Sequence, residues 1–257
     1  MKKARSALRA VIGGVAFLAA PAIVAPSRAW SQEWSWPDRA ENLQVLPEDF
    51  PPERLSAVMR GFTRSLGVRC SYCHVGEEGQ PLTTYDFVSD SIPQKDIART
   101  MYRMLGVIND TLATIDPSGP KPVNMWCHTC HRGRPRPTTL DEELAEVHEA
   151  EGIHATVAAY RELRERFYGR GAFDFGENVL NMFGYSLLGE GKAADAVAIF
   201  QLNAEQYPQS ANAWDSLGEG YLAAGDETLA IESYERSLEL DPENENARQK
   251  LTEIRGG

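Results

Sequence analysis

The sequence predicts an all-α protein built from two helical parts. Apolar residues recur at helical spacing in two segments of the N-terminal half, and the C-terminal half repeats itself with a period of 34 residues. The chain has 257 residues, 42% of them hydrophobic and 25% charged, as in ordinary globular proteins. The net charge of −11 argues against a nucleic-acid-binding protein, because phosphate recognition normally requires a basic excess.

Residues 1–29 are predicted to be a secretory signal peptide. A basic segment precedes an apolar stretch from Ala10 to Ala25, and small residues follow at Ser27, Ala29 and Ser31. The apolar stretch contains Pro21 and is shorter than the ~20 residues of a bilayer span, which argues against an uncleaved anchor. We therefore expect a periplasmic or extracellular protein.

The four cysteines form two copies of the motif CxxCH, which are Cys70, Cys73 and His74, and Cys127, Cys130 and His131. Two thiols at this spacing reach the two vinyl groups of one haem as thioethers, and the adjacent histidine places an imidazole nitrogen on the iron. The motifs therefore predict two covalently bound haem c groups, with His74 and His131 as iron ligands.

Three other uses of the cysteines are a thioredoxin-like redox pair, a four-cysteine zinc site and disulfides. A redox pair does not require histidine at the next position twice, and no βαβ pattern surrounds either motif. The gap of more than fifty residues between the motifs and the repeated histidine favour haem over zinc.

A first helix is predicted after Pro51 and Pro52, and Gly67 ends it. Its apolar face carries Leu55, Val58, Met59, Phe62 and Leu66. Met59 lies eleven residues before Cys70, so this helix can pack across the first haem with its sulfur near the iron. Histidine and methionine together make a six-coordinate iron of raised potential, suited to electron transfer.

A second helix is predicted from about Pro93, between the two motifs. Its apolar side carries Ile97, Met101, Met104, Leu105, Ile108, Leu112 and Ile115. Met101 or Met104 is the candidate distal ligand of the second haem. A methionine on a helical apolar stripe is often a core residue, and that alternative stays open for both helices.

Three segments resemble one two-haem half of the photosynthetic reaction-centre cytochrome c subunit family. They are Leu66 to His74, Ala98 to Asn109 with its Ala-Arg-x-Met sequence, and Cys127 to Gly133. The likeness covers roughly residues 45 to 137. In that family each haem unit is a helix with the distal ligand, a turn and CxxCH, and the subunit re-reduces the oxidised chlorophyll pair of the reaction centre. The resemblance implies that Met59 and Met101 are the two distal ligands. The best-known members carry four haems, whereas this chain has cysteines for two.

The C-terminal half shows the tetratricopeptide pattern. Residues 177–210 align with 211–244, and the matched positions include Gly184 with Gly218, Ala196 with Ala230 and Phe200 with Tyr234. We expect two helix pairs, a capping helix from Asn246 to Ile254, and a further helix from Ile153 to Tyr168. The predicted organisation is a di-haem cytochrome domain at residues 32–138, a helical linker at 139–176, and an α-solenoid of tetratricopeptide helix pairs at 177–257.

These observations predict an exported di-haem c-type cytochrome that carries single electrons and is not an enzyme. We expect a redox protein as donor and another as acceptor, a peptide or protein partner in the tetratricopeptide groove, and association with a membrane photosynthetic or respiratory complex. The alternatives are a di-haem peroxidase with one five-coordinate iron, or a haem-bearing scaffold or assembly factor. The haem region shows no acid–base constellation for peroxidase chemistry.

A basic turn follows the second motif, with Arg132, Arg134 and Arg136 interleaved with Gly133 and Pro135. Pairing with haem propionates, docking of a partner and a solvated linker are three alternatives for it.

Overall fold

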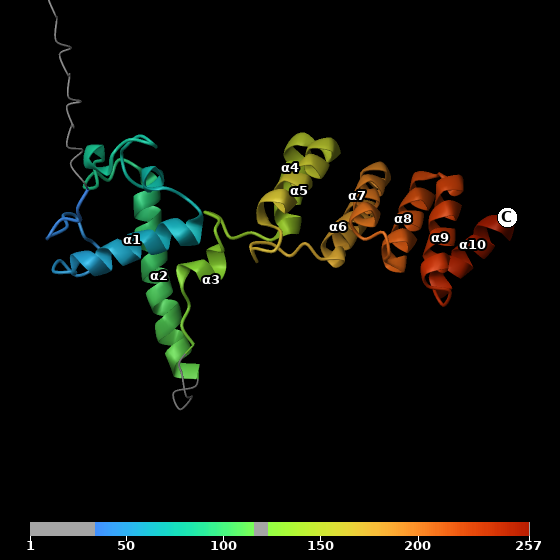
Figure 1. Ribbon diagram of the computed structural model, residues 1–257. Coiled ribbons are helices and arrows are strands. Elements are labelled where there is room, and N and C mark those ends of the chain that lie inside the picture. Colours follow the sequence, from blue (N-terminus) through green and yellow to red (C-terminus); the bar gives the residue numbers. More distant parts are fainter. Residues whose placement is uncertain (1–33, 116–122, 257) are drawn as a thin grey trace, which may run out of the picture.

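The computed structural model describes residues 34–115 and 123–256 of the protein (Figure 1). Over these residues the chain forms ten α-helices, two short 3₁₀ turns and no β-strand, so the all-α prediction is confirmed. None of the described helices is long and apolar enough to cross a membrane. The predicted signal peptide, residues 1–29, lies outside the described residues.

Three helices form the N-terminal region: α1 (Pro52–Leu66), α2 (Pro93–Ile115) and α3 (Cys127–His131). α1 begins with proline in its first turn and ends at Gly67, whose φ of 67° is a left-handed conformation that favours glycine. The second CxxCH motif itself forms the short helix α3. The predicted helices of this half are therefore present.

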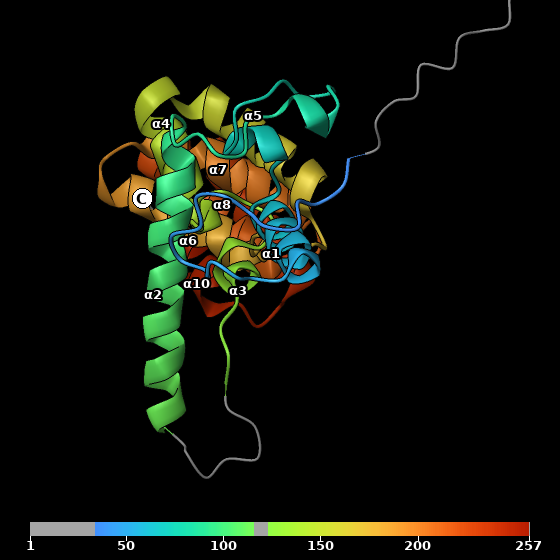
Figure 2. The same cartoon turned by 90° about the vertical axis from the view of Figure 1, so that its left-hand side faces the viewer.

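The apolar side of α2 is only partly covered, since Ile97, Met104 and Ile115 are exposed and the other four of its apolar residues are partly buried. Arg99 is the one side chain of this helix that is buried within the described structure, while Ile97, Val107 and Ile115 are exposed. The helix is about 35 Å long, and its C-terminal half extends away from α1 in both Figure 1 and Figure 2. An amphipathic helix normally buries its apolar stripe, so this surface is available to a large apolar group.

Seven further helices follow one another in a row toward the C-terminus (Figure 1). They are α4 (Leu140–Glu151), α5 (Ile153–Phe167), α6 (Glu177–Gly189), α7 (Ala193–Gln206), α8 (Ala211–Ala224), α9 (Glu227–Leu240) and α10 (Glu245–Gly256). The pairs α6–α7 and α8–α9 are the two predicted repeats, and α10 is the predicted final helix.

The 34-residue period has a packing reason. A Cβ added at Gly184 would lie 2.5 Å from the ring of Phe200, and one added at Gly218 would lie 2.8 Å from the ring of Tyr234. Ala196 is completely buried in the first repeat, as is its equivalent in the second. Small residues therefore recur where the two helices of a repeat approach each other and an aromatic ring fills the space beside them.

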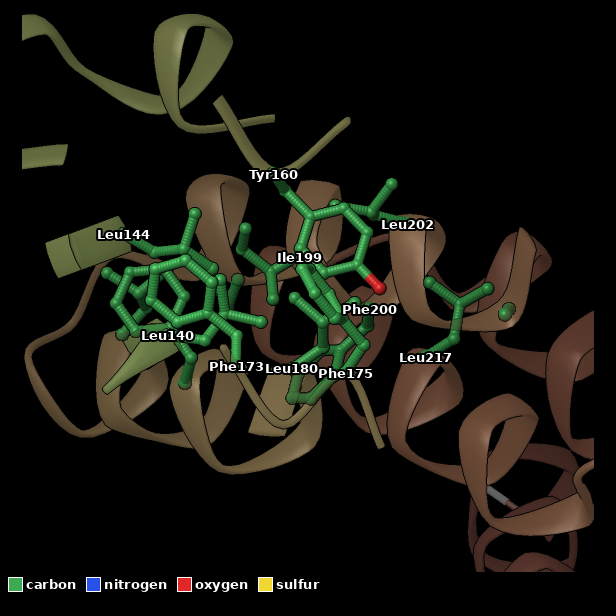
Figure 3. Packing of buried hydrophobic residues seen from close by; sticks show 14 of the residues in the cluster. Leu140, Leu144, Tyr160, Phe173, Phe175, Leu180, Ile199, Phe200, Leu202 and Leu217 are labelled. Carbon is green, nitrogen blue, oxygen red and sulfur yellow. The ribbon is translucent and has the colours of Figure 1, made fainter. Parts of the chain in front are cut away.

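The segment predicted as a linker is part of the solenoid core. Leu140 and Leu144 of α4 and Tyr160 of α5 lie in one cluster with Leu180, Ile199 and Phe200 of the first repeat (Figure 3). His148 of α4 also pairs with Asp195 of α7, with Nε2 and Oδ2 2.8 Å apart. This segment contains α4 and α5, and α5 is the predicted further helix, which covers an apolar face that the first repeat would otherwise expose.

We expect Gly184→Ala to lower the free energy of unfolding by about 1–3 kcal/mol, because its methyl group overlaps the buried ring of Phe200. Gly189→Ala is the matched control: it lies in the same helix and its Cβ would meet no atom within 4 Å. That control should be neutral or slightly stabilising. Urea unfolding of both variants measures the difference, and equal losses would contradict this packing.

Candidate haem sites

One cavity gathers the predicted ligands of the first haem. It has a volume of about 740 Å³ and its lining includes Met59, Cys70, Cys73 and His74. This volume is within the range of sites that enclose a cofactor-sized molecule. The structure thus brings together a thioether, two thiols and an imidazole from α1 and the segment that follows it.

The first motif is folded so that its side chains converge. The backbone N–H groups of Cys73 and His74 both donate to the carbonyl of Cys70, at 3.2 and 2.9 Å. In such a turn, residues three and four apart lie on the same side. Cys70, Cys73 and His74 therefore face one space because of their spacing alone.

The ring of His74 is held in an apolar environment. Phe87 packs against it with ring centroids 4.9 Å apart, and Trp34 packs against Phe87 with ring centroids 4.8 Å apart. Burial, together with the positive charges of Lys95 and Arg99, lowers the pKa of His74 to about 4. The imidazole is neutral at physiological pH, which is the form that binds a metal.

Two cations lie in the lining of this cavity. Arg99 is 7% exposed and pairs with Asp90 at 2.9 Å and with Asp96 at 2.5 Å. The ammonium of Lys95 donates to three backbone carbonyls and also pairs with Asp90 at 3.0 Å. Hydrogen bonds from Arg99 and then Asn42 and Lys95 hold the pKa of Asp90 well below its usual range. This network fixes the loop before α2 and gives one wall of the cavity a positive character.

Three observations bear on the other sites considered for the cysteines. All four are free, so no disulfide joins them. Burial raises the pKa of Cys73 and of Cys127, whereas a thioredoxin-like pair needs a lowered pKa. Among the described residues, no group of three His, Cys, Asp or Glu side chains lies close enough together to hold a metal ion.

In the second motif the histidine is already oriented. His131 is 8% exposed, and its Nδ1 lies 3.0 Å from the carbonyl oxygen of Arg134. With a carbonyl as acceptor, Nδ1 carries the proton and Nε2 is the nitrogen left to bind iron. The preceding turn is closed by Thr129 and Trp126, which exchange two hydrogen bonds of 2.9 and 3.0 Å.

Met101 and the second motif lie outside the cavity described above. Met101 is partly buried on α2, whereas Met104 is 47% exposed. On the same helix, the amide side chain of Asn109 makes two hydrogen bonds to the backbone of Met125, of 3.0 and 2.6 Å. This holds α2 beside the segment that enters the second motif.

The two motifs are joined through their backbones. The N–H of Gly133 donates to the carbonyl of Ser65 at 2.8 Å, and a Cβ on Gly67 would overlap the carbonyl of Gly133. Ser65 and Gly67 lie just before the first motif and Gly133 just after the second. The end of α1 is thus fixed against the turn that carries His131.

Four residues of these sites had no assigned role from the sequence: Trp34, Lys95, Arg99 and Asn109. Arg99 lies inside the Ala-Arg-x-Met segment, so the resemblance to the family could have pointed to this residue. Trp34 and Asn109 act through contacts with residues distant in sequence, and Lys95 acts through the fold of the loop just before it, which no local pattern reveals.

Comparison with known proteins separates the two halves of the chain. The family model described as photosynthetic reaction centre cytochrome C subunit matches residues 20–166, which is more than half of the chain, and a tetratricopeptide repeat model matches residues 211–244. The first match extends beyond the predicted boundary at residue 138 and includes α4 and nearly all of α5.

Curated relatives match through a short segment. Superkiller complex protein 3 of Homo sapiens is 39% identical over 61 residues, and that of Mus musculus is 36% identical over 64 residues. These matches cover 24% and 25% of the chain but 4% of either relative. Two solved structures are also similar: the first TPR of Spaghetti (RPAP3) bound to HSP90 peptide SRMEEVD, and the first TPR domain of the human RPAP3 protein. Both are 19% identical, with TM-scores of 0.32 and 0.33, over 46% of this chain and 88% and 87% of theirs.

We expect Gly67→Ala to lower the free energy of unfolding by more than Gly79→Ala does. Both glycines have a positive φ, of 67° and 86°, so both variants carry a strain of about 1–2 kcal/mol. Only at Gly67 does the new Cβ also overlap the backbone of Gly133; at Gly79 it meets nothing within 4 Å. Chemical unfolding of the purified variants measures the difference. A Gly79 variant as unstable as the Gly67 variant would contradict the backbone joint.

Proposed function

Because the chain belongs to the photosynthetic reaction-centre cytochrome c subunit family, which implies haem c binding, we propose that it is an exported di-haem cytochrome that carries single electrons. The observation that carries the proposal is the cavity in which Met59, Cys70, Cys73 and His74 converge. A second CxxCH motif with an oriented, buried histidine supports a second haem. In this proposal the protein is a carrier and not an enzyme.

The residues of the first site fit a haem in three respects. Cys70 and Cys73 would supply the two thiols for thioether bonds, and His74 and Met59 would be the residues that bind the iron. The apolar lining around Phe87 and Trp34 excludes water from the site. Lys95 and Arg99 add positive charge to the wall, which suits the carboxylates of a haem. Bound haem supplies an iron that takes up and releases one electron.

In the second site, Cys127 and Cys130 supply the thiols and His131 the proximal nitrogen. Met101 is the proposed distal ligand, because it lies partly buried on α2 while Met104 is exposed. The exposed part of the apolar side of α2 is the surface that this haem would cover. The hydrogen bond to the carbonyl of Arg134 makes His131 a stronger electron donor to its iron.

We infer the kinds of partner from the net charge of the protein and from its tetratricopeptide repeats. With a net charge of −11, the protein favours redox donors and acceptors that present basic faces. We further propose that the acceptor belongs to a membrane photosynthetic or respiratory complex, and that the tetratricopeptide groove holds a protein or peptide partner.

We expect the purified protein to carry two covalently attached haems per chain. Intact-mass measurement together with the absorption spectrum counts them. Replacing Cys70 and Cys73 by serine should leave one haem, and replacing Cys127 and Cys130 should leave the other, because each pair holds its own cofactor. A wild-type chain with one haem or none would overturn the proposal.

We expect Met59→Leu to lower the midpoint potential of one haem and Met101→Leu that of the other, because a thioether ligand raises the potential. Leucine keeps the volume of the side chain. Met104→Leu is the matched control on the same helix and should change neither potential. If Met104→Leu shifts the midpoint potential of the second haem and Met101→Leu does not, the assignment of Met101 as its ligand is wrong.

A further inference from the structure

The basic turn after the second motif leads into the solenoid core. The side chain of Arg134 is 9% exposed, and its guanidinium donates to the carbonyls of Thr138 and Ala172 at 2.7 and 3.0 Å and to the hydroxyl of Thr138 at 3.1 Å. The guanidinium carbon also lies 3.8 Å from the centre of the Phe173 ring. Ala172 and Phe173 belong to the same hydrophobic cluster as the first repeat.

The backbone of the same residue holds the proximal histidine. The carbonyl oxygen of Arg134 lies 3.0 Å from Nδ1 of His131, and the N–H of Arg134 donates to the carbonyl of His131 at 2.9 Å. The side chain of one residue is thus fixed by the solenoid, while its backbone orients a haem ligand.

The neighbouring arginines do not have this double role. Arg136 is exposed and forms an ion pair with Glu146 of α4. Arg132 reaches the carbonyl of Gly171 at 3.2 Å from an exposed position. The first haem site has no equivalent either, since Nδ1 of His74 is buried without a hydrogen-bond partner among the described residues.

We propose that Arg134 is a positioning residue that couples the solenoid core to the second haem by fixing the hydrogen bond between its own carbonyl and His131. The proposal rests on the proposed function, in that it takes His131 as an iron ligand. A well-aligned hydrogen bond on Nδ1 increases electron donation from the imidazole and stabilises the ferric state. Loosening Arg134 therefore raises the potential of the second haem and leaves that of the first unchanged.

The charge of Arg134 and its positioning of His131 affect the potential of the second haem in opposite directions, so one test can tell them apart. Removing a positive charge near a haem stabilises the ferric state and lowers its potential. A weaker hydrogen bond on His131 raises it. The sign of the shift in Arg134→Gln therefore separates positioning from simple electrostatics, and Phe173→Leu perturbs the same contact without changing any charge.

The experiment compares full-length, haem-loaded protein with four variants. They are Arg134→Gln, Arg134→Lys, Phe173→Leu and the exposed control Arg136→Gln. Redox titration followed by absorption gives both midpoint potentials, and electron paramagnetic resonance gives the g-values of each low-spin haem. We expect Arg134→Gln and Phe173→Leu to raise one potential and shift one set of g-values. Arg134→Lys should also raise that potential, because lysine keeps the charge but not the planar fork, so the rise is not opposed by the loss of a charge. Arg136→Gln should change neither the midpoint potentials nor the g-values of the two haems.

Any of three results would overturn the proposal. They are unchanged or lowered midpoint potentials in folded Arg134→Gln, equal shifts of the potentials of both haems, and an equal shift of potential in Arg136→Gln. Circular dichroism checks the fold, and if Arg134→Gln does not fold, Phe173→Leu decides the question alone. The haem count is measured on the same samples. A wild-type count below two contradicts the proposed function, whereas two haems with unshifted potentials contradict only the coupling.

Discussion

The end of α1 meets the turn after the second CxxCH motif through backbone atoms, and the rest of the N-terminal region is arranged around this contact. The N–H of Gly133 bonds to Ser65, and Gly67 lies so close to Gly133 that no side chain fits between them. α1 leads directly into the first motif, and Gly133 directly follows the second. Both histidines are therefore attached to one rigid joint, although 57 residues separate them in the chain.

The two halves of the protein obtain stability in different ways. The solenoid has one buried hydrophobic cluster that runs from Leu140 of α4 to Leu217 of α8. The N-terminal region instead encloses a 740 Å³ cavity, and its longest helix buries only Arg99 among the described residues. A ligand that binds only the folded state stabilises that state. The cytochrome domain thus keeps a large cavity in its interior, while the repeats fold around their own side chains.

The turn from Arg132 to Arg136 connects these halves through three different contacts. One guanidinium is buried against Phe173, one reaches the carbonyl of Gly171, and one pairs with Glu146 on α4. Only Arg134 is buried by its contact, while Arg132 and Arg136 stay exposed to solvent. The reaction-centre-type cytochrome domain and the tetratricopeptide repeats are accordingly packed together, and the family match that runs through α4 agrees with this.

The sequence by itself determined the helices, the two haem motifs and the repeats, because each depends on spacing within one helical turn or one 34-residue unit. Gly67 ends α1 and His74 follows Cys73, and both signals are read from a few neighbouring residues. Ala196 and Ala230 recur one period apart, and this signal is read by aligning the chain with itself. Only the tertiary structure decided that α4 belongs to the solenoid core, that Gly67 meets Gly133, and that Arg134 lies between His131 and Phe173. These contacts join residues that are far apart in the chain or depend on which way a side chain points, and neither a periodic pattern nor a motif contains that information.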